Sequence, residues 1–476
     1  MDAGWWHAAI HNRPRERSVD RFAGLQHGET TGGQAKGILP RARTVMGAFE
    51  EELSRRLDAL EKEHLRRRLR RMGSAQTPHA TIEGRTVLNF SSNDYLGLAT
   101  HPTPKEAAAR ATRDFGTGSG ASRLICGSLE AHEALEEAIA AFKGAEGALI
   151  FSSGYSTALG TITALVGSGD IVVVDKLVHA SIVDAARLSG AKLRVYAHND
   201  LNGLEEILQW CDGQRGANPT GRVLIVTESL FSMDGDFAPL REIVALKEKF
   251  GAWLMVDEAH ATGLFGENRR GLIEAFGLAG RVEIQMGTLG KAIGAAGGFI
   301  VGSRALREYL INKARSFIFS TAPPPAVSAA AKAAIDVIQS RDGEALLQRL
   351  RGRLRRFQKA TGIAAPAEDS PIVPFTVGAE AAALSLAERL WEAGIFVPAI
   401  RYPTVARGKA RLRFTFGGFE HLDENTEYDS IAAAGLQSQK HHAGRNLCRY
   451  KQAGHRNRNT LSHCALRENA PLLVCF

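Results

Sequence analysis

The chain has 476 residues, enough for two or three domains, and its 44% hydrophobic and 23% charged residues are typical of soluble globular proteins. No uninterrupted apolar run approaches the roughly 18 residues that a membrane-spanning helix needs, so we expect no membrane partner. Much of the basic character behind the net charge of +8 lies in "LRRRLRRM" (65–72). Acidic residues precede these arginines on a predicted helix, which favours a solvated helix face over a nucleic-acid site.

Cysteine usage and the opening residues bear on the compartment. The five cysteines are an odd number without paired spacing, which favours a reducing environment over a disulfide framework. The opening "MDAGWWHAAIHNRPRER" lacks the basic, apolar and small-residue order of a secretory signal. We therefore expect a cytoplasmic protein.

The first 94 residues divide into two parts. Residues 1–45 mix polar residues and glycine without lasting periodicity, and we predict a disordered or processed extension. Apolar residues then recur at helical spacing from 49 to about 72, which predicts an amphipathic helix. The stretch "HATIEGRTVLNF" (79–90) predicts two short strands around a turn at 83–84. We assign 46–94 to an N-terminal helix and hairpin segment.

Seven short apolar runs alternate with helical patterns between 131 and about 307. They are "GALIFS", "DIVVVD", "KLRVYA", "RVLIVTES", "WLMVDEAH", "IQMGTLG" and "GGFIVGS". Strands this apolar are buried on both faces, so we predict an α/β fold with a mainly parallel seven-stranded sheet covered by helices, in a large domain at 95–334. Ligands bind such sheets beyond the carboxyl ends of the strands. The residues that follow each run are therefore the candidates for a site.

The C-terminal third is predicted to hold a second domain. A long helix follows "STAPPPA". The runs "SPIVPFTVG", "GIFVPAIRYPTV" and "ARLRFTF" then predict strands, with one helix between the first two, in a smaller α+β domain at 335–416. Residues 417–476 form an atypical polar tail for which a frame change or a fusion is one hypothesis. A zinc-binding or basic interaction module is a weaker alternative for this tail, based on His441, His442, Cys448, His463 and Cys464.

One lysine stands apart from the others. Lys291 lies in "QMGTLGKAIGAAGG" (285–298), where its neighbours are so small that a bulky group could lie against the backbone. A solvated loop lysine is the alternative to a desolvated, reactive amine. Asp257 and His260 follow a buried strand, and a carboxylate there needs a cationic partner.

Together these residues fit one cofactor. An amine for covalent attachment, the hydroxyls and N–H groups of "FSSGY" (151–155) and "GTGSGAS" (116–122), and an acid for a ring nitrogen suit pyridoxal phosphate. A dinucleotide fingerprint in "GTGSG" is the weaker interpretation, since no apolar strand precedes it. No metal is required by this set of residues.

The ordered motifs "NDYLGL", "GSGASRLICGSLEAHEALEEAIAAF", "FSSGYSTALG", "TESLFSMDGDFAPL", "MVDEAHATGLFGENRRG", "TLGKAIGAAGG" and "AIRYPTV" resemble the α-oxoamine synthases. These are fold-type I pyridoxal-phosphate transferases that condense an amino acid with an acyl-CoA. The resemblance runs from about 50 to 416. It implies a PLP-dependent acyltransferase with a homodimeric assembly and active sites at the subunit interface.

The resemblance also implies roles for individual residues. Lys291 holds the cofactor covalently, Asp257 pairs with its ring nitrogen, and His260 with Ser232 meets its phenolic oxygen. His179 stacks on the ring. The implied phosphate contacts are Gly154, Tyr155 and Thr288, with Ser320 and Thr321 from the neighbouring subunit. The implied substrate contacts are Arg401 for the amino-acid carboxylate, Asn93 beside it, and Arg66 near the acyl substrate.

Several of these assignments have plainer alternatives. His179 could cap the following helix, Ser153 could do the same for its own helix, and Asp234 more simply shapes the "MDGD" turn. The implied reaction is a decarboxylative condensation of L-alanine with an acyl-CoA or acyl carrier protein thioester. A glycine-using or serine-using reaction of the same family, and a non-catalytic partner subunit of the same fold, are the alternatives.

Overall fold

The computed structural model describes residues 41–215 and 221–419. The described residues divide between two units, one that ends at Lys62 and one that begins at Glu63. The described part of the first unit is helix α1 (Arg41–Lys62), so residues 41–45, which we predicted to belong to a disordered extension, are helical. The remainder of that extension and the tail from 420 onward, with its histidines and cysteines, lie outside the described residues.

The predicted continuation of the first helix to residue 72 is wrong. Helix α1 ends at Lys62, and His64 has a left-handed backbone with a φ of 57°. Farther along, the backbone of this segment bonds to other parts of the chain: Glu83 N–H donates to the Arg71 carbonyl at 2.9 Å, and Gly73 N–H donates to the Thr81 carbonyl at 2.7 Å. These bonds use backbone groups that a helix would need, so the arginine-rich segment is irregular.

Strands β1 (His79–Ile82) and β2 (Arg85–Asn89) form an antiparallel hairpin. Glu83 and Gly84 connect them, both with positive φ (50° and 77°), as a tight two-residue hairpin turn requires. Strand β2 also pairs in parallel with β11 (Ile395–Phe396), which comes from the C-terminal third of the chain. The hairpin is thereby attached to the C-terminal part of the fold.

All seven predicted strands of the large sheet are present, in the order β3-β9-β8-β7-β6-β4-β5. Their bounds are β3 (Gly147–Phe151), β4 (Ile171–Asp175), β5 (Lys192–Tyr196), β6 (Val223–Glu228), β7 (Trp253–Asp257), β8 (Ile284–Thr288) and β9 (Gly298–Gly302). The pairs from β5 through β4, β6 and β7 to β8 are parallel, and β9 is antiparallel to both of its neighbours. The prediction of a mainly parallel α/β sheet is confirmed.

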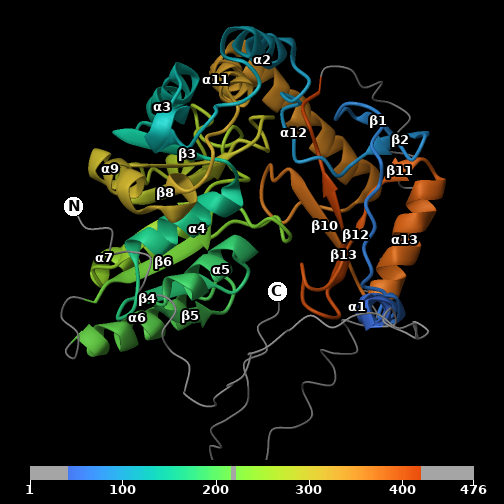
Figure 1. The fold of residues 1–476 in the computed structure, drawn as a ribbon, viewed down its shortest axis with the longest axis horizontal. Coiled ribbons are helices and arrows are strands. Elements are labelled where there is room, and N and C mark those ends of the chain that lie inside the picture. The colour runs from blue at the N-terminus through green and yellow to red at the C-terminus, as the bar shows by residue number, and fades with distance from the viewer. Residues whose placement is uncertain (1–40, 216–220, 420–476) are drawn as a thin grey trace, which may run out of the picture. The chain divides into compact units, whose positions relative to one another are not determined.

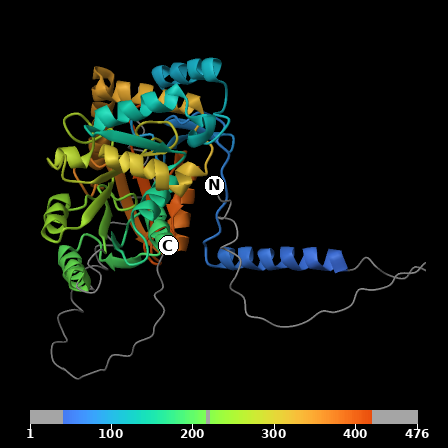
Figure 2. The ribbon, with the colours of Figure 1, turned by 60° about the vertical axis from the view of Figure 1, so that its left-hand side comes forward.

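Helices cover both faces of this sheet (Figure 1). Two separate hydrophobic clusters fill the two faces, because alternate residues of each strand point to opposite sides. The helices are α2 (Pro102–Phe115), α3 (Glu130–Lys143), α4 (Gly154–Leu165), α5 (Ala180–Ser189), α6 (Leu201–Arg215), α7 (Leu240–Lys249), α8 (Leu272–Ala275), α9 (Arg304–Lys313), α10 (Arg315–Ile318) and α11 (Pro325–Gln339). A short π-helical segment spans Arg123–Gly127. Helix α11 packs against α2 and α3, and α2 and α11 lie side by side in both ribbon views (Figures 1 and 2).

A smaller sheet follows in the C-terminal third, with the order β10-β13-β12. It comprises β10 (Ile372–Gly378), β12 (Ala399–Ile400) and β13 (Ala410–Thr415), and it is accompanied by α12 (Arg341–Thr361) and α13 (Glu380–Glu392). The single strand predicted over "GIFVPAIRYPTV" is wrong. Two prolines in this stretch lack backbone donors, so only β11 and β12, of two residues each, form there and join different sheets.

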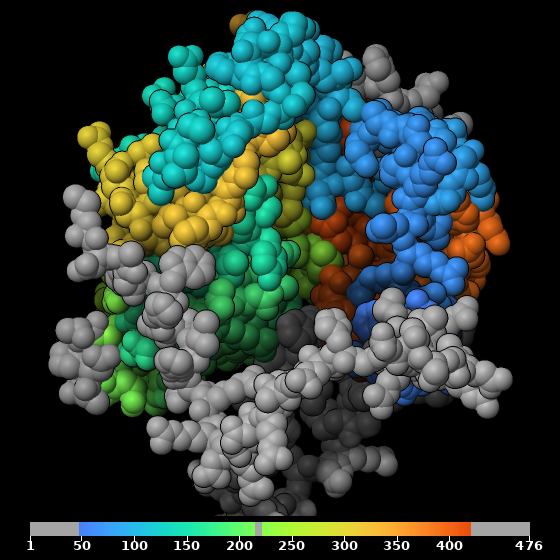
Figure 3. Space-filling model, in the orientation of Figure 1, coloured from blue at the N-terminus to red at the C-terminus, as the bar shows by residue number. Residues whose placement is uncertain are grey.

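The small sheet packs against α12 and the end of the N-terminal segment through aromatic side chains and backbone bonds. Phe90, Phe357 and Phe414 pack together, with ring centroids 5.2 to 6.4 Å apart. Thr415 N–H donates to the Phe90 carbonyl at 2.8 Å. In the space-filling view the orange-red residues of the small sheet lie beside the green residues of the large domain (Figure 3). The domain boundary at residue 335 stays a prediction.

None of the helices within the described residues is both long enough and apolar enough to span a membrane.

Candidate active site at the carboxyl edge of the large sheet

Three neighbouring strands of the large sheet end in residues with useful chemistry. Glu228 ends β6 and is the register partner of Asp257, which ends β7. Lys291 follows β8 in the short connection to β9, and this connection is closed by a bond from Thr288 Oγ1 to the Gly297 carbonyl at 2.9 Å. The parallel arrangement therefore brings Asp257 and the predicted reactive lysine to one edge of the sheet.

Lys291 has a perturbed amine. Its side chain is half-buried, and burial lowers its pKa to about 8, although the nearby Asp257 and Glu228 carboxyl groups act in the opposite direction. An amine with this pKa is neutral in a substantial fraction near neutral pH, which is the form that acts as a nucleophile or a base. These surroundings favour the reactive amine over the solvated loop lysine, and the role of Lys291 stays a prediction.

Asp257 is buried, and its Oδ1 accepts a hydrogen bond from Ala259 N–H at 2.9 Å. The next residue, Glu258, holds this loop in place. Its Oε2 lies 2.6 Å from Lys143 Nζ, which also donates to Thr262 Oγ1 at 3.1 Å. Both members of the ion pair are 1% exposed, so the pair is desolvated and breaking it is costly. The pair fixes the segment that carries Asp257 and His260 to helix α3.

Glu228 is a site residue that the sequence did not single out for a role. It is 2% exposed, and burial, followed by the charge of Asp257, raises its pKa to about 8. Its Oε2 accepts from Ser232 N–H at 3.2 Å, while Oε1 is buried without a hydrogen-bond partner among the described residues. Two adjacent carboxyl groups rarely ionise together. The raised pKa of Glu228 therefore favours its protonated form at neutral pH.

His260 belongs to a second group of contacts that reaches the small sheet. Its Nδ1 lies 2.7 Å from the Tyr95 hydroxyl, which in turn accepts from Arg413 Nη2 at 3.3 Å. Arg413 also donates to Asn93 Oδ1 at 3.1 Å and to the Ser232 carbonyl at 2.6 Å. Burial, together with the positive charges of Lys291 and Arg413, holds the pKa of His260 well below its usual range.

The structure thus connects three predicted site residues, His260, Ser232 and Asn93, through Arg413 and Tyr95, which sequence reasoning missed. Arg413 lies in a strand that the sequence identified only by its apolar pattern. The residues on either side of Arg413 belong to none of the motifs quoted above. The position of its side chain can therefore be seen only from the packing of the small sheet against the large one.

The start of helix α4 forms the predicted phosphate end of the site. Ser153 is its N-cap and accepts from Ser156 N–H at 3.1 Å, which confirms the capping alternative for this serine. The N–H groups of Gly154 and Tyr155, in the first turn, have no acceptor within the helix. A side chain at Gly154 would meet Thr288 Cβ at 3.7 Å, so these two predicted phosphate residues are adjacent.

His179 is the N-cap of α5. Its Nδ1 lies 2.8 Å from Ser181 Oγ and accepts from Ser181 N–H at 3.3 Å. Burial lowers its pKa, so the ring is neutral and apolar enough to stack on another ring. The cap contact is one of the two roles that we weighed for this residue. Stacking on the cofactor, the other role, stays a prediction.

The remaining predicted residues lie in two places. Thr321 forms a β-bridge with Ser122, which joins Ser320 and Thr321 to the glycine-rich segment 116–122. Arg401 donates to the carbonyl groups of His64 and Arg66. Arg401 and Arg66 are therefore neighbours, while Asn93 is bound by Arg413. Asp234, interpreted as a turn residue, forms an ion pair with Arg411 Nη1 at 2.7 Å.

The fold and this site define a class of protein. A mainly parallel seven-stranded sheet, with a lysine of lowered pKa after β8 and a buried aspartate at the end of β7, is the architecture of fold-type I transferases. Residues 85–426 match the family model described as aminotransferase class I and II.

Comparison with individual proteins shows which members of this class the chain resembles. The chain is 50% identical over 362 residues to 8-amino-7-oxononanoate synthase from Geobacter sulfurreducens, covering 75% of this chain and 91% of the relative. Among solved structures, it resembles serine palmitoyltransferase from S. paucimobilis with a bound PLP–myriocin aldimine, with a TM-score of 0.73, 30% identity, and coverage of 84% of this chain and 98% of that one. It also resembles 8-amino-7-oxononanoate synthase from Francisella tularensis, with a TM-score of 0.61, 29% identity, and coverage of 75% and 99%. The chain belongs to the aminotransferase class I and II family, in the branch that contains the 8-amino-7-oxononanoate synthases.

Proposed function

We propose that this enzyme condenses L-alanine with a pimeloyl thioester, carried by coenzyme A or a carrier protein, to give 8-amino-7-oxononanoate and carbon dioxide in biotin biosynthesis. The names of its relatives support this reaction. The observation that carries the proposal is the half-buried Lys291 amine, with its lowered pKa, beside the buried Asp257 carboxylate.

Pyridoxal phosphate is the cofactor, and the residues present fit it. Lys291 offers an amine for the aldehyde, Asp257 an anion for the ring nitrogen, and the first turn of α4, with Gly154 and Tyr155, offers N–H groups for the phosphate. When bound, the cofactor supplies an electron sink for the bonds at the Cα atom of the amino acid. We keep the predicted contacts of Thr288, and of Ser320 and Thr321 from a second subunit, as part of this proposal.

The chain's own residues supply proton transfer and orientation. With the cofactor bound, the Lys291 amine would take the Cα proton of the amino acid as general base, because its lowered pKa makes the neutral form accessible near neutral pH. Asp257 would keep the ring nitrogen of the bound cofactor protonated, since a buried anion strongly favours a nearby positive charge. While Glu228 holds its proton, it places no second negative charge beside Asp257.

Capture of the cofactor is expected to depend on pH. Only the neutral amine attacks an aldehyde, so the rate at which the apoprotein takes up pyridoxal phosphate should rise with pH and reach half its maximum at about pH 8. Stopped-flow absorbance would measure it. In Glu228→Gln the midpoint should move to lower pH, because Glu228, with a pKa of about 8, is partly ionised at the midpoint and its negative charge raises the pKa of Lys291. A rate that does not change with pH would contradict the assignment of Lys291.

Two arginines compete for the carboxylate of the amino acid. Sequence resemblance points to Arg401, whereas Arg413 is 7% exposed and contacts Asn93, Tyr95 and Ser232 within the site. These three bonds leave two of its five N–H groups for a ligand.

We expect Arg413→Lys to raise the KM for the amino acid roughly 10- to 150-fold, since a hydrogen bond to a charged group contributes about 1.5–3 kcal/mol. Arg401→Lys, the matched control, should change the same KM less. Steady-state kinetics with varied amino acid would measure both. A larger increase in this KM for Arg401→Lys would instead assign the amino-acid carboxylate to Arg401.

The reaction itself is tested with the holoenzyme. Spectral titration with alanine, glycine and serine, followed by assays with a panel of acyl thioesters, should show the highest kcat/KM for alanine with the pimeloyl thioester. A preference for glycine or serine would place the enzyme with other α-oxoamine synthases. A protein that binds cofactor and turns over none of these pairs would be a non-catalytic subunit.

A second copy of the chain is part of the proposal, because Ser320 and Thr321 were assigned to a neighbouring subunit's phosphate. Several large apolar side chains are exposed near these residues, including Ile125 at 79% and Phe319 at 70%. Burial of such side chains is a common reason for association. Sedimentation of the holoenzyme should therefore give twice the mass of the chain.

A further inference from the structure

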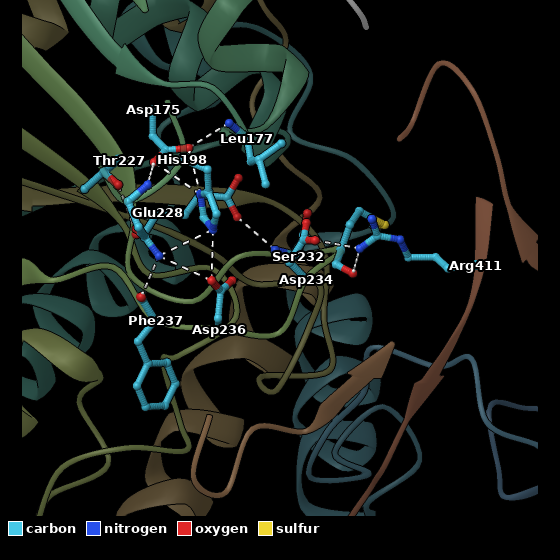
Figure 4. A network of polar contacts seen from close by, with 12 residues as sticks. Asp175, Leu177, His198, Thr227, Glu228, Ser232, Asp234, Asp236, Phe237 and Arg411 are labelled. Atoms are coloured by element: carbon cyan, nitrogen blue, oxygen red, sulfur yellow. Dashed lines mark hydrogen bonds and ion pairs between the residues drawn. The ribbon is translucent and has the colours of Figure 1, made fainter. Parts of the chain in front are cut away.

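A partly buried polar network lies beside the site and joins residues of "RVYAHND" (194–200) to Asp236 of "FSMDGD" (231–236), and the proposed chemistry assigns no role to its central histidine (Figure 4). Its centre is His198, at the carboxyl edge of the large sheet just after β5. Nδ1 of His198 lies 3.0 Å from Asp175 Oδ1, and Nε2 lies 2.9 Å from Asp236 Oδ2. Both ring nitrogens thus face carboxylates.

Only the protonated imidazole can donate from both nitrogens at once. Burial lowers the pKa of His198, but the hydrogen bonds with Asp175 and Asp236 outweigh this effect and raise it to about 10. The ring also packs edge-on against Phe231, with centroids 4.4 Å apart. His198 is therefore a fixed cation between two acids.

Asp175 fixes one end of this bridge to the sheet. It is fully buried at the end of β4 and accepts from Leu177 N–H at 2.7 Å and from Asn199 N–H at 2.8 Å. Its carboxylate therefore has a defined position, and it defines the position of His198 in turn.

Asp236 belongs to a short loop that returns on itself between β6 and α7. Its carbonyl accepts from Phe231 N–H at 3.0 Å, and Leu230 pairs with Phe237 in a β-bridge. Asn199 Nδ2 adds a bond to the Phe237 carbonyl at 3.1 Å. His198 and Asn199 thus hold the base of this loop, which we call the 229–238 loop.

The tip of the 229–238 loop meets both the site and the small sheet. Ser232 donates to Glu228 Oε2 and accepts from Arg413, while Asp234 pairs with Arg411. Gly235 has a φ of 72°, and a side chain there would lie 2.5 Å from the Ile372 carbonyl of β10, so the tip lies directly against the small sheet.

We propose that His198, bridging Asp175 and Asp236, is a positioning residue that sets the 229–238 loop so that Ser232 and Arg413 are aligned for the amino-acid substrate. This inference rests on the proposed function, because it assigns Arg413 to the amino acid. His198 acts only through Asp236 and the loop.

The test uses the holoenzyme with alanine and a pimeloyl thioester. His198→Gln keeps similar size but presents an amide oxygen to one of the two acids. We expect its kcat/KM to fall roughly 10- to 100-fold, in line with a small misplacement of reacting groups. The fall should lie mainly in the KM for alanine, with the KM for the acyl thioester and the cofactor absorbance close to those of the wild type.

A second substitution distinguishes positioning from general damage. In His198→Gln/Asp236→Asn the new amide can donate to the glutamine oxygen, so most of the lost kcat/KM should return. The exposed His79→Gln is the control and should match the wild type. Unchanged kinetics in His198→Gln, or a loss that Asp236→Asn does not reverse, would overturn the inference.

Should His198→Gln fail to fold, Asp236→Asn alone provides the test. It removes one anchor of the loop and should also raise the KM for alanine, whereas an unchanged KM would overturn the inference. Failure of the proposed function is seen separately, because wild-type protein would then show no turnover of alanine with any acyl thioester.

Discussion

Lys291→Ala is expected to lower turnover by about 10⁴-fold or more, because it removes both the general base, typically worth about 10²–10⁴, and the covalent attachment of the cofactor. The half-buried amine with a pKa lowered to about 8 is the physical reason for this expectation. Purified variant and wild type, each saturated with pyridoxal phosphate, would be compared by initial rate and by visible absorbance, and borohydride should attach the cofactor to the wild type alone.

The control is Lys105→Ala, an exposed lysine on α2. It should retain wild-type rate and absorbance. Thermal unfolding of Lys291→Ala should be little changed, since Lys291 forms no ion pair with any other residue that the structure describes. A Lys291→Ala protein that still turns over alanine and a thioester would refute the central role of this residue.

Asp257→Asn should reduce kcat by roughly 10²- to 10⁴-fold, the equivalent of about 3–5 kcal/mol for leaving a buried charge unpaired. The substitution is conservative in shape, because the amide oxygen can still accept from Ala259 N–H, as the carboxylate does at 2.9 Å. It removes only the negative charge that keeps the cofactor nitrogen protonated. The measurement is kcat at saturating substrates, with cofactor content determined for each preparation.

Asp336→Asn serves as the matched control, since Asp336 is paired with Lys332 on the surface of α11 and should contribute little. If Asp257→Asn kept more than about a tenth of the wild-type kcat, a deficit of under about 1.4 kcal/mol, the ring nitrogen would not depend on this carboxylate.

The sequence was sufficient for the large sheet because its strands are short, continuous and apolar. Runs such as "DIVVVD" can be buried on both faces only in a covered parallel sheet, and all seven are strands in the structure. The local sequence pattern gave a wrong prediction where hydrogen bonds to distant parts of the chain determine the structure. The arginines after Lys62 continue a helical periodicity, but the backbone at Arg71 and Gly73 bonds to the hairpin instead.

The same distinction applies to the site. Lys291, Asp257 and His260 follow strands within recognisable motifs, so their convergence could be predicted from the order of the strands alone. Arg413 and Tyr95 could not, because their roles depend on how the small sheet packs against the large one. Glu228 lies in a motif, but its raised pKa arises from its burial and from its register beside Asp257, neither of which a sequence pattern states.

Strand β9, which is antiparallel to both of its neighbours in the large sheet, has a further consequence. Because β9 returns directly beside β8, the segment carrying Lys291 is a short hairpin connection, where a parallel return would need a long crossover. The conformational entropy of the segment that carries Lys291 is therefore lost when the sheet forms, before any ligand binds. Backbone amides of Thr288 and Gly298 should therefore exchange with deuterium as slowly as those at the centre of the sheet.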